Sequence, residues 1–202
     1  MSILTHYGGS VLAMCGKSSV VLISDKRLGN GNITVGSINR ITTLNNNTML
    51  GQAGFIPDNQ RIVNILKKNI NLYNLNEGRN MQEEVVDMLS YILYEKRFTP
   101  YYTQPVIAGR NKENKYYVAS MDCVGCIDSS NSFMAAGTAS NNLMGLAENL
   151  YREDMDEEDL VVTAVQVFIN AVDRDCLSGS GIDCYIMNNH GIERKYIQCR
   201  MD

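Results

Sequence analysis

The chain contains 202 residues, of which 45% are apolar and 20% charged, and its formal net charge is −4. This composition is typical of a folded globular protein and excludes a disordered chain. About 200 residues suffice for one domain with a core of its own, so neither a disulfide nor a structural metal is needed for stability. The mild negative charge, without a basic stripe, argues against nucleic acid or an anionic membrane as a partner.

No segment of the sequence has the length and apolarity of a membrane span. Tight apolar runs such as residues 20–23 are far shorter than the roughly 18 residues that a spanning helix requires. Residues 1–6 lack the basic region and the long apolar core of a secretory signal. We therefore expect the six cysteines to be reduced thiols and the protein to reside in the cytoplasm and the nucleus.

The first fifty residues carry the short apolar runs that are typical of β-strands. Residues 10–14 and 19–24 flank a turn at Gly16-Lys17 and predict a hairpin. Further strands are predicted at residues 33–35, 40–44 and 48–53.

The apolar spacing then changes to a helical period after Pro57, a residue that suits the first turn of a helix. The first helix is predicted to end at about Asn76. A second begins at Asn80, whose spacing from Glu83 resembles a capping box, and ends before Pro100. The remaining predictions are strands at 106–109, 116–120 and 133–136, helices at 140–151 and 156–174, and a hairpin at 182–187 and 192–198.

The predicted order is thus strands, two helices, strands, two helices and a final hairpin. Helices do not alternate one for one with strands, which argues against a parallel doubly wound sheet. We predict an α+β fold of four layers, αββα, in which two antiparallel sheets pack together and a pair of helices covers each outer face.

Several motifs in this order resemble the proteasome beta-subunit family. Residues 25–27 (DKR) end the opening strand pair, residues 53–54 (AG) end a later strand, and residues 173–179 (DRDCLSG) begin at the end of the last predicted helix. Four segments look most like the beta-type-3 members: 94–98 (YEKRF), 100–103 (PYYT), 105–109 (PVIAG) and 200–202 (RMD). The sequence shows no linker, repeat or low-complexity tract, so we expect residues 1–202 to form one domain. The resemblance implies the N-terminal-nucleophile hydrolase fold, a four-layer sandwich that agrees with the predicted order of elements.

The resemblance also implies a reaction for the catalytic members of the family. Removal of a propeptide after a glycine leaves a threonine as the first residue. Its hydroxyl attacks the peptide carbonyl, and its own amine, or a water that the amine holds, acts as the base. A lysine lowers the local pKa, an aspartate near the start holds that lysine, and a glycine N–H stabilises the oxyanion.

In this chain, two of those positions carry residues that cannot do the same chemistry. The early aspartate matches Asp25, which puts the threonine position on Gly9 and, after a one-residue gap, the lysine position on Arg40. Glycine has no nucleophile, and arginine stays protonated and cannot join proton transfer as lysine can. We therefore expect no peptidase activity, an ion pair between Asp25 and Arg40, and a short N-terminal extension at residues 1–8. The remaining family positions match Gly54, Asp175 and Ser178.

Two hydroxyls near Gly9 leave an alternative open, an active threonine or serine peptidase with an atypical N-terminus. Thr5 lies four residues upstream of the expected position and does not follow a glycine. Ser10 adjoins Gly9, but a shift of one residue in a strand points the side chain to the opposite face. Asp175 and Ser178 are expected to shape a turn and not to perform chemistry.

The resemblance further implies a role beside a neighbouring subunit. In a beta ring, each active pocket is completed by the next subunit, and beta-type-3 members adjoin the trypsin-like beta-type-2 subunit. Asp122, Cys126 and Asp128 match positions that face the neighbour's substrate cleft. The alternative is that Asp122 only caps a turn. The implied partners are the beta-type-2 and beta-type-4 subunits, the alpha-ring subunits and the opposite beta ring.

Cys123 and Cys126 have the C-x-x-C spacing of thiol oxidoreductases and of half a zinc site. A zinc site needs four ligands, yet there is no second C-x-x-C, and His6 and His190 lie far apart in the sequence. A thioredoxin-like motif opens a helix after a strand, which is not the context here. We therefore expect no cofactor and no metal, and we interpret the acidic residues 153–159 as a solvated helix start.

Overall fold

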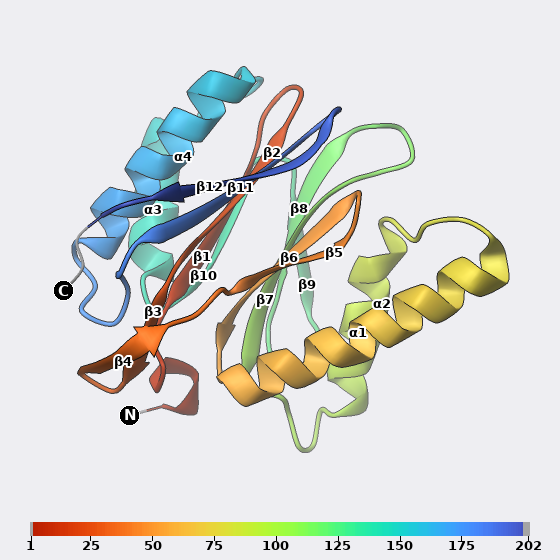
Figure 1. Ribbon diagram of the computed structural model, residues 1–202, viewed down its shortest axis with the longest axis horizontal. Coiled ribbons are helices and arrows are strands. Elements are labelled where there is room, and N and C mark those ends of the chain that lie inside the picture. The colour runs from red at the N-terminus through yellow and green to blue at the C-terminus, as the bar shows by residue number, and fades with distance from the viewer. Residues whose placement is uncertain (1, 200–202) are drawn as a thin grey trace.

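The computed structural model describes residues 2–199, so residues 200–202, which form part of the beta-type-3 resemblance, lie outside the described residues. Two antiparallel sheets lie face to face between two pairs of helices, as Figure 1 shows. Buried apolar clusters fill the gap between the sheets and the gap between each sheet and its helices. The predicted αββα sandwich is therefore confirmed.

The first sheet has the strand order β10-β1-β2-β11-β12, and all of its neighbours are antiparallel. Its strands are β1 (Ser10–Cys15), β2 (Val20–Asp25), β10 (Phe133–Gly137), β11 (Ile182–Asn188) and β12 (Gly191–Ile197). Strands β1 and β2 are buried along their whole length. Leu12 and Met14 face the helices, whereas Val11 and Ala13 face the other sheet. Burial on both faces explains the nearly continuous apolar sequence of these strands.

The second sheet has the order β5-β6-β7-β8-β9, also antiparallel throughout. Its strands are β5 (Ile41–Asn45), β6 (Thr48–Gly54), β7 (Thr103–Arg110), β8 (Tyr116–Met121) and β9 (Ile127–Ser130). Gly51 on β6 faces the first sheet, where a Cβ atom would lie 2.6 Å from Cγ1 of Val11. A glycine is required here because the two sheets approach closely.

The helices cover the outer faces in pairs, as Figure 1 shows. They are α1 (Ile56–Glu77) and α2 (Glu84–Glu95) on the second sheet, and α3 (Ser140–Leu150) and α4 (Glu157–Val172) on the first. Gly78 caps the C-terminus of α1, and its left-handed conformation, with φ of 63°, favours glycine. Among the helices of residues 2–199, none combines the length and the apolarity that crossing a membrane requires.

Three short elements were not predicted from the sequence: the 3-10 turn η1 (Ile3–Thr5), strand β3 (Arg27–Asn30) and strand β9. Strand β3 pairs with β4 (Ile33–Ser37) in a separate two-stranded ribbon.

The predicted cap of the second helix was wrong. Helix α2 begins at Glu84, and Asn80 does not cap it. The backbone N–H of Met81 instead donates to Oδ1 of Asn74, and that of Gln82 donates to a carboxylate oxygen of Glu84. These two N–H groups are hydrogen-bonded to side-chain oxygens in a non-helical segment, so the first turn of α2 begins after them.

Candidate functional site

The residues that match the catalytic positions of the family lie at the ends of different elements. Gly9 directly precedes β1, Asp25 ends β2, and Arg40 directly precedes β5. Asp175 and Ser178 lie in the loop between α4 and β11. The fold brings these five residues together.

The Asp25 carboxylate connects four parts of the chain. Its Oδ1 atom accepts hydrogen bonds from the Ser10 backbone N–H (2.9 Å) and from Nε of Arg40 (3.0 Å). Its Oδ2 atom accepts from the backbone N–H groups of Gly179 (3.1 Å) and Arg27 (3.3 Å). Burial raises the pKa of Asp25, and the Arg40 charge and the three backbone donors oppose that rise. The predicted ion pair is confirmed, and both of its side chains are buried.

Arg40 occupies the space in which a side chain at residue 9 would begin. A Cβ atom built on Gly9 would lie 2.1 Å from Cζ of Arg40, far inside van der Waals contact. The guanidinium is held there because Nη2 donates to the carbonyl oxygen of Arg27 (2.5 Å) while Nε binds Asp25. Gly9 also has a φ of 103°, in the region that favours glycine. The position thus lacks a nucleophile and lacks room for one.

A second polar cluster surrounds Asp175. Its Oδ2 atom accepts hydrogen bonds from the hydroxyls of Thr138 (2.5 Å) and Ser178 (2.7 Å). Its Oδ1 atom accepts from the backbone N–H of Leu177 (3.1 Å), so Asp175 shapes the turn as predicted. The Ser10 hydroxyl lies 2.9 Å from that of Ser178 and can donate to it. The Ser10 hydroxyl is fully buried within this cluster, where it also accepts a hydrogen bond from the backbone N–H of Ala139 (2.9 Å).

Sequence reasoning missed two residues of this site, Thr138 and Arg27. The backbone N–H of Thr138 donates to the Gly9 carbonyl (3.1 Å), while its hydroxyl binds Asp175. Arg27 is 2% exposed and donates to the carbonyl oxygens of Leu177 (3.2 Å) and Gly31 (3.3 Å), so it ties the β3–β4 ribbon to the loop after α4. Thr138 is a single threonine after a glycine, and it belongs to no motif that could be detected in the sequence. An arginine in a charged motif normally indicates a surface residue.

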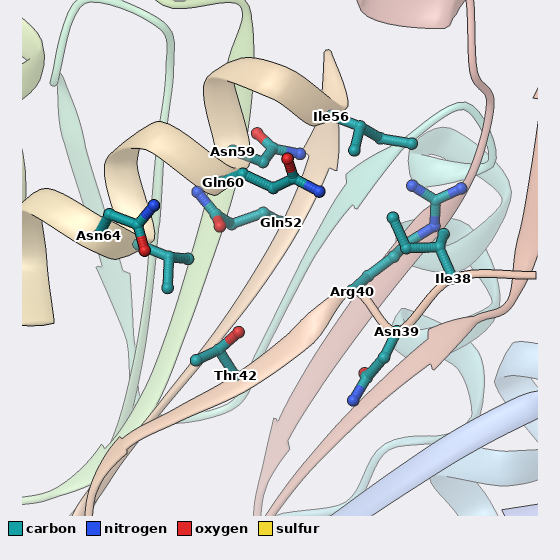
Figure 2. Close-up of a pocket in the computed structure, with 10 residues that line it drawn as sticks. Ile38, Asn39, Arg40, Thr42, Gln52, Ile56, Asn59, Gln60 and Asn64 are labelled. Atoms are coloured by element: carbon teal, nitrogen blue, oxygen red, sulfur yellow. The ribbon is translucent and has the colours of Figure 1, made fainter.

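A cavity of about 390 Å³, lined by both polar and apolar side chains, lies beside Arg40, between α1 and strands β5 and β6. Figure 2 shows Ile38 and Ile56 near the guanidinium, Asn59 and Asn64 further along α1, and Gln52 on β6. The residues that line it include no aspartate, glutamate, histidine, lysine or cysteine. The lining can therefore make polar contacts, but it supplies no base for hydrolysis at neutral pH.

Gly54, the predicted oxyanion position, ends β6 two residues after Gln52. Its φ is 101°, and a Cβ atom there would lie 2.6 Å from the carbonyl oxygen of Tyr102. These constraints explain the glycine without an oxyanion role.

The N-terminal segment is anchored next to this site within the described residues 2–8. The backbone N–H groups of Gly29 and Gly31 donate to the carbonyl oxygens of Tyr7 (3.1 Å) and His6 (3.0 Å). Thr5, the alternative nucleophile, lies inside the turn η1, and its hydroxyl donates to the Ser2 carbonyl (3.0 Å). Both hydroxyls considered as substitute nucleophiles thus take part in hydrogen bonds within the described residues.

Asp122, Cys126 and Asp128 lie elsewhere, at the hairpin between β8 and β9, and all three are exposed. One oxygen of Asp122 accepts from the backbone N–H groups of Val124 (3.0 Å) and Cys126 (2.9 Å), so Asp122 does cap the turn. Cys123 and Cys126 occupy this hairpin loop and do not open a helix. Within residues 2–199, no group of three histidine, cysteine, aspartate or glutamate side chains is suited to hold a metal ion.

The thiols are expected to differ sharply in reactivity. Burial raises the pKa of both Cys15 and Cys184 to about 12, whereas Cys126 and Cys176 are exposed. Because the thiolate is the nucleophile, iodoacetamide at neutral pH should alkylate the two exposed thiols in the native chain and spare the two buried ones. Peptide mass spectrometry with a denatured control checks this. Equal alkylation of all four before unfolding would show that the buried pair is accessible.

Comparison with known proteins places this site in a family. The family model described as "Proteasome subunit" matches residues 5–187. The chain is 39% identical to proteasome subunit beta type-3-A of Arabidopsis thaliana and 35% identical to the probable proteasome subunit beta type-3 of Schizosaccharomyces pombe, with both chains covered in full. It is 38% identical to proteasome subunit beta type-3 of Saccharomyces cerevisiae over 96% of both chains. This chain therefore belongs to the proteasome subunit family.

Proposed function

We propose that this chain is a non-catalytic structural subunit of the beta ring of the proteasome core particle, where it supports ATP- and ubiquitin-dependent protein degradation by assembly. The observation that carries the proposal is the Arg40 guanidinium in the space next to Gly9, because it blocks a nucleophile at the position where the family's catalytic members have one. The names of the relatives, beta type-3 subunits, support the assignment to the beta ring.

The decisive experiment examines the chain in the purified endogenous particle. Intact mass spectrometry should find an N-terminus that still precedes Gly9, and a threonine-directed epoxyketone should label other subunits but not this one. An N-terminus newly exposed at Thr5 or Ser10, together with labelling of this subunit, would support the alternative of an active peptidase with an atypical N-terminus.

The proposed partners are other beta subunits, with beta-type-2 and beta-type-4 as the ring neighbours, the alpha ring and the opposite beta ring. The proposed location is the cytoplasm and the nucleus. Large apolar side chains on several surfaces support contacts with other subunits. The most exposed are Ile33, Val35, Leu75, Tyr91 and Phe98.

Self-association of the isolated chain is the expected consequence, because apolar patches of more than a few hundred Å² rarely stay exposed on monomers. Sedimentation velocity over a range of concentrations should show a mass that rises above that of the monomer. A sharp monomer at high concentration would count against ring membership.

We further propose that Asp122, Cys126 and Asp128 line the substrate pocket of the neighbouring beta-type-2 subunit. Asp122 caps its turn through Oδ1, and no hydrogen bond within residues 2–199 occupies its other oxygen. Asp122→Asn keeps an acceptor for the turn and removes only the charge. It should lower kcat/KM of the assembled particle for substrates with basic residues by about fivefold or less, as expected for an exposed ion pair.

The matched control is Asp159→Asn on α4, an exposed residue whose replacement makes the same change of charge. It should leave the kinetics for basic substrates unchanged. If Asp122→Asn behaves like this control while the particle assembles normally, the pocket role is wrong and the scaffold role alone remains.

A further inference from the structure

Strand β9 forms an open edge of the second sheet. It pairs with β8 on one side only, and residues 127–129 are exposed. The backbone N–H of Asp122 donates to the Cys126 carbonyl at the start of this ladder (3.4 Å). Hydrogen-bonded pairs alternate along an antiparallel ladder, so the backbone groups of Ile127 and Ser129 face away from β8. Such an unpaired edge is a template for a strand from another chain.

A groove of about 470 Å³ runs beside this edge, between α2 and strands β8 and β9. Val86, Ala119 and Ile127 provide its apolar part. Glu83 and Asp87, four residues apart at the start of α2, add two carboxylates on one side of the helix. No lysine or arginine lines the groove. Its chemistry therefore suits a side chain with an aliphatic stem and a positive end.

The carboxylates at the start of α2 differ in their ionic partners. Glu84, between the two groove carboxylates in sequence, forms ion pairs with Lys112 (2.5 Å) and Arg79 (3.4 Å). Within residues 2–199, neither Glu83 nor Asp87 forms an ion pair. A basic ligand would therefore find two carboxylates without a competing cation.

The edge and the groove are suited to act together, since the side chains of Ile127 and Ser129 line the groove while their backbone groups face outward. In a strand added beside β9, every second side chain would lie over the groove. We propose that this surface binds an extended basic segment of another chain by strand addition, with an arginine in the groove.

Arginine suits the groove because its stem covers apolar surface while its planar fork of donors matches a carboxylate with two hydrogen bonds. The next residue of the added strand would lie on the opposite face, near Asp128, which is exposed and forms no ion pair within residues 2–199. A second copy of this chain fits poorly, because pairing β9 with β9 would bring Asp128 close to its own copy, and like charges across a pair of strands repel. The preferred segment thus has two adjacent basic residues.

Fluorescence anisotropy on the dilute full chain tests this proposal with two labelled peptides. One is Thr-Val-Thr-Arg-Lys-Thr-Val-Thr, and the other has two glutamines in place of the basic pair. The basic peptide should bind at least ten times more tightly, and the double variant Glu83→Gln/Asp87→Asn should abolish most of that preference. The matched control Glu158→Gln/Asp159→Asn on α4 makes the same change of charge and should bind like the unmodified chain. Equal affinity for both peptides, or an equal loss in the control, overturns the proposal.

Ser129→Pro separates strand addition from simple charge attraction. Proline is tolerated on an edge strand where the N–H faces outward, and it removes one donor for the added strand. The variant should lose at least tenfold in affinity with an unchanged unfolding curve. In the unmodified chain, saturation with the basic peptide should slow amide exchange at Ile127 and Ser129 at least tenfold. If exchange at both residues is unaffected, the peptide binds elsewhere and the proposal fails, whatever the stability of the proline variant.

Discussion

Arg40→Ala is expected to lower the free energy of unfolding by about 3–5 kcal/mol, because it leaves the Asp25 charge buried without its ionic partner. Asp25 would keep three backbone donors, but the carbonyl oxygen of Arg27 would lose its contact with the guanidinium. Arg40→Lys keeps a positive charge but cannot reach two acceptors with a planar fork, so its cost should be smaller.

Urea unfolding of the dilute full chain, followed by circular dichroism, measures this effect. The control is Lys195→Ala, which removes a cation 3.7 Å from Glu193 in a pair whose side chains are both about half exposed. Its cost should stay below about 1 kcal/mol. If Arg40→Ala costs no more than this control, the ion pair does not hold Asp25 in place. The buried contacts around Asp25 would then tolerate the loss of the cation.

The layers of the fold could be predicted because the apolar pattern reports burial directly. Strands β1 and β2 read as continuous apolar runs because they lie between two cores. Helices α1 and α4 repeat apolar residues at helical spacing because only one side of each is covered. Strand β9 has the sequence IDSS and strand β3 has RLGN, and such short polar runs carry no period. Their existence depends on neighbours that are distant in sequence.

The site was predictable only in part, for a related reason. The Asp25–Arg40 ion pair could be predicted because two charged residues occupy family positions. The hydrogen bond from the Leu177 N–H to Asp175 could be predicted because the local sequence favours a turn. The approach of Arg40 to Gly9 cannot be derived in this way. It depends on the angle at which β5 leaves the second sheet and on Arg27, whose carbonyl oxygen fixes the guanidinium. Contacts set by packing between sheets leave no local signal in the sequence.

Gly9→Ala is expected to cost more than about 2 kcal/mol, because the new Cβ atom would lie 2.1 Å from Cζ of Arg40 and the backbone has a φ of 103°. The matched control Gly36→Ala meets no atom within 4 Å and should change the free energy of unfolding by less than about 0.5 kcal/mol.

A double-mutant cycle separates the steric contact from the backbone strain at Gly9. In the Arg40→Ala background the clash disappears and only the strain remains, so Gly9→Ala should cost at least about 1 kcal/mol less there than in the unmodified chain. If the two changes are additive within about 0.5 kcal/mol, the guanidinium does not block the position. If they are coupled as expected, a nucleophile cannot be restored by replacing Gly9 alone, because the guanidinium has to leave this space before a threonine side chain can enter it.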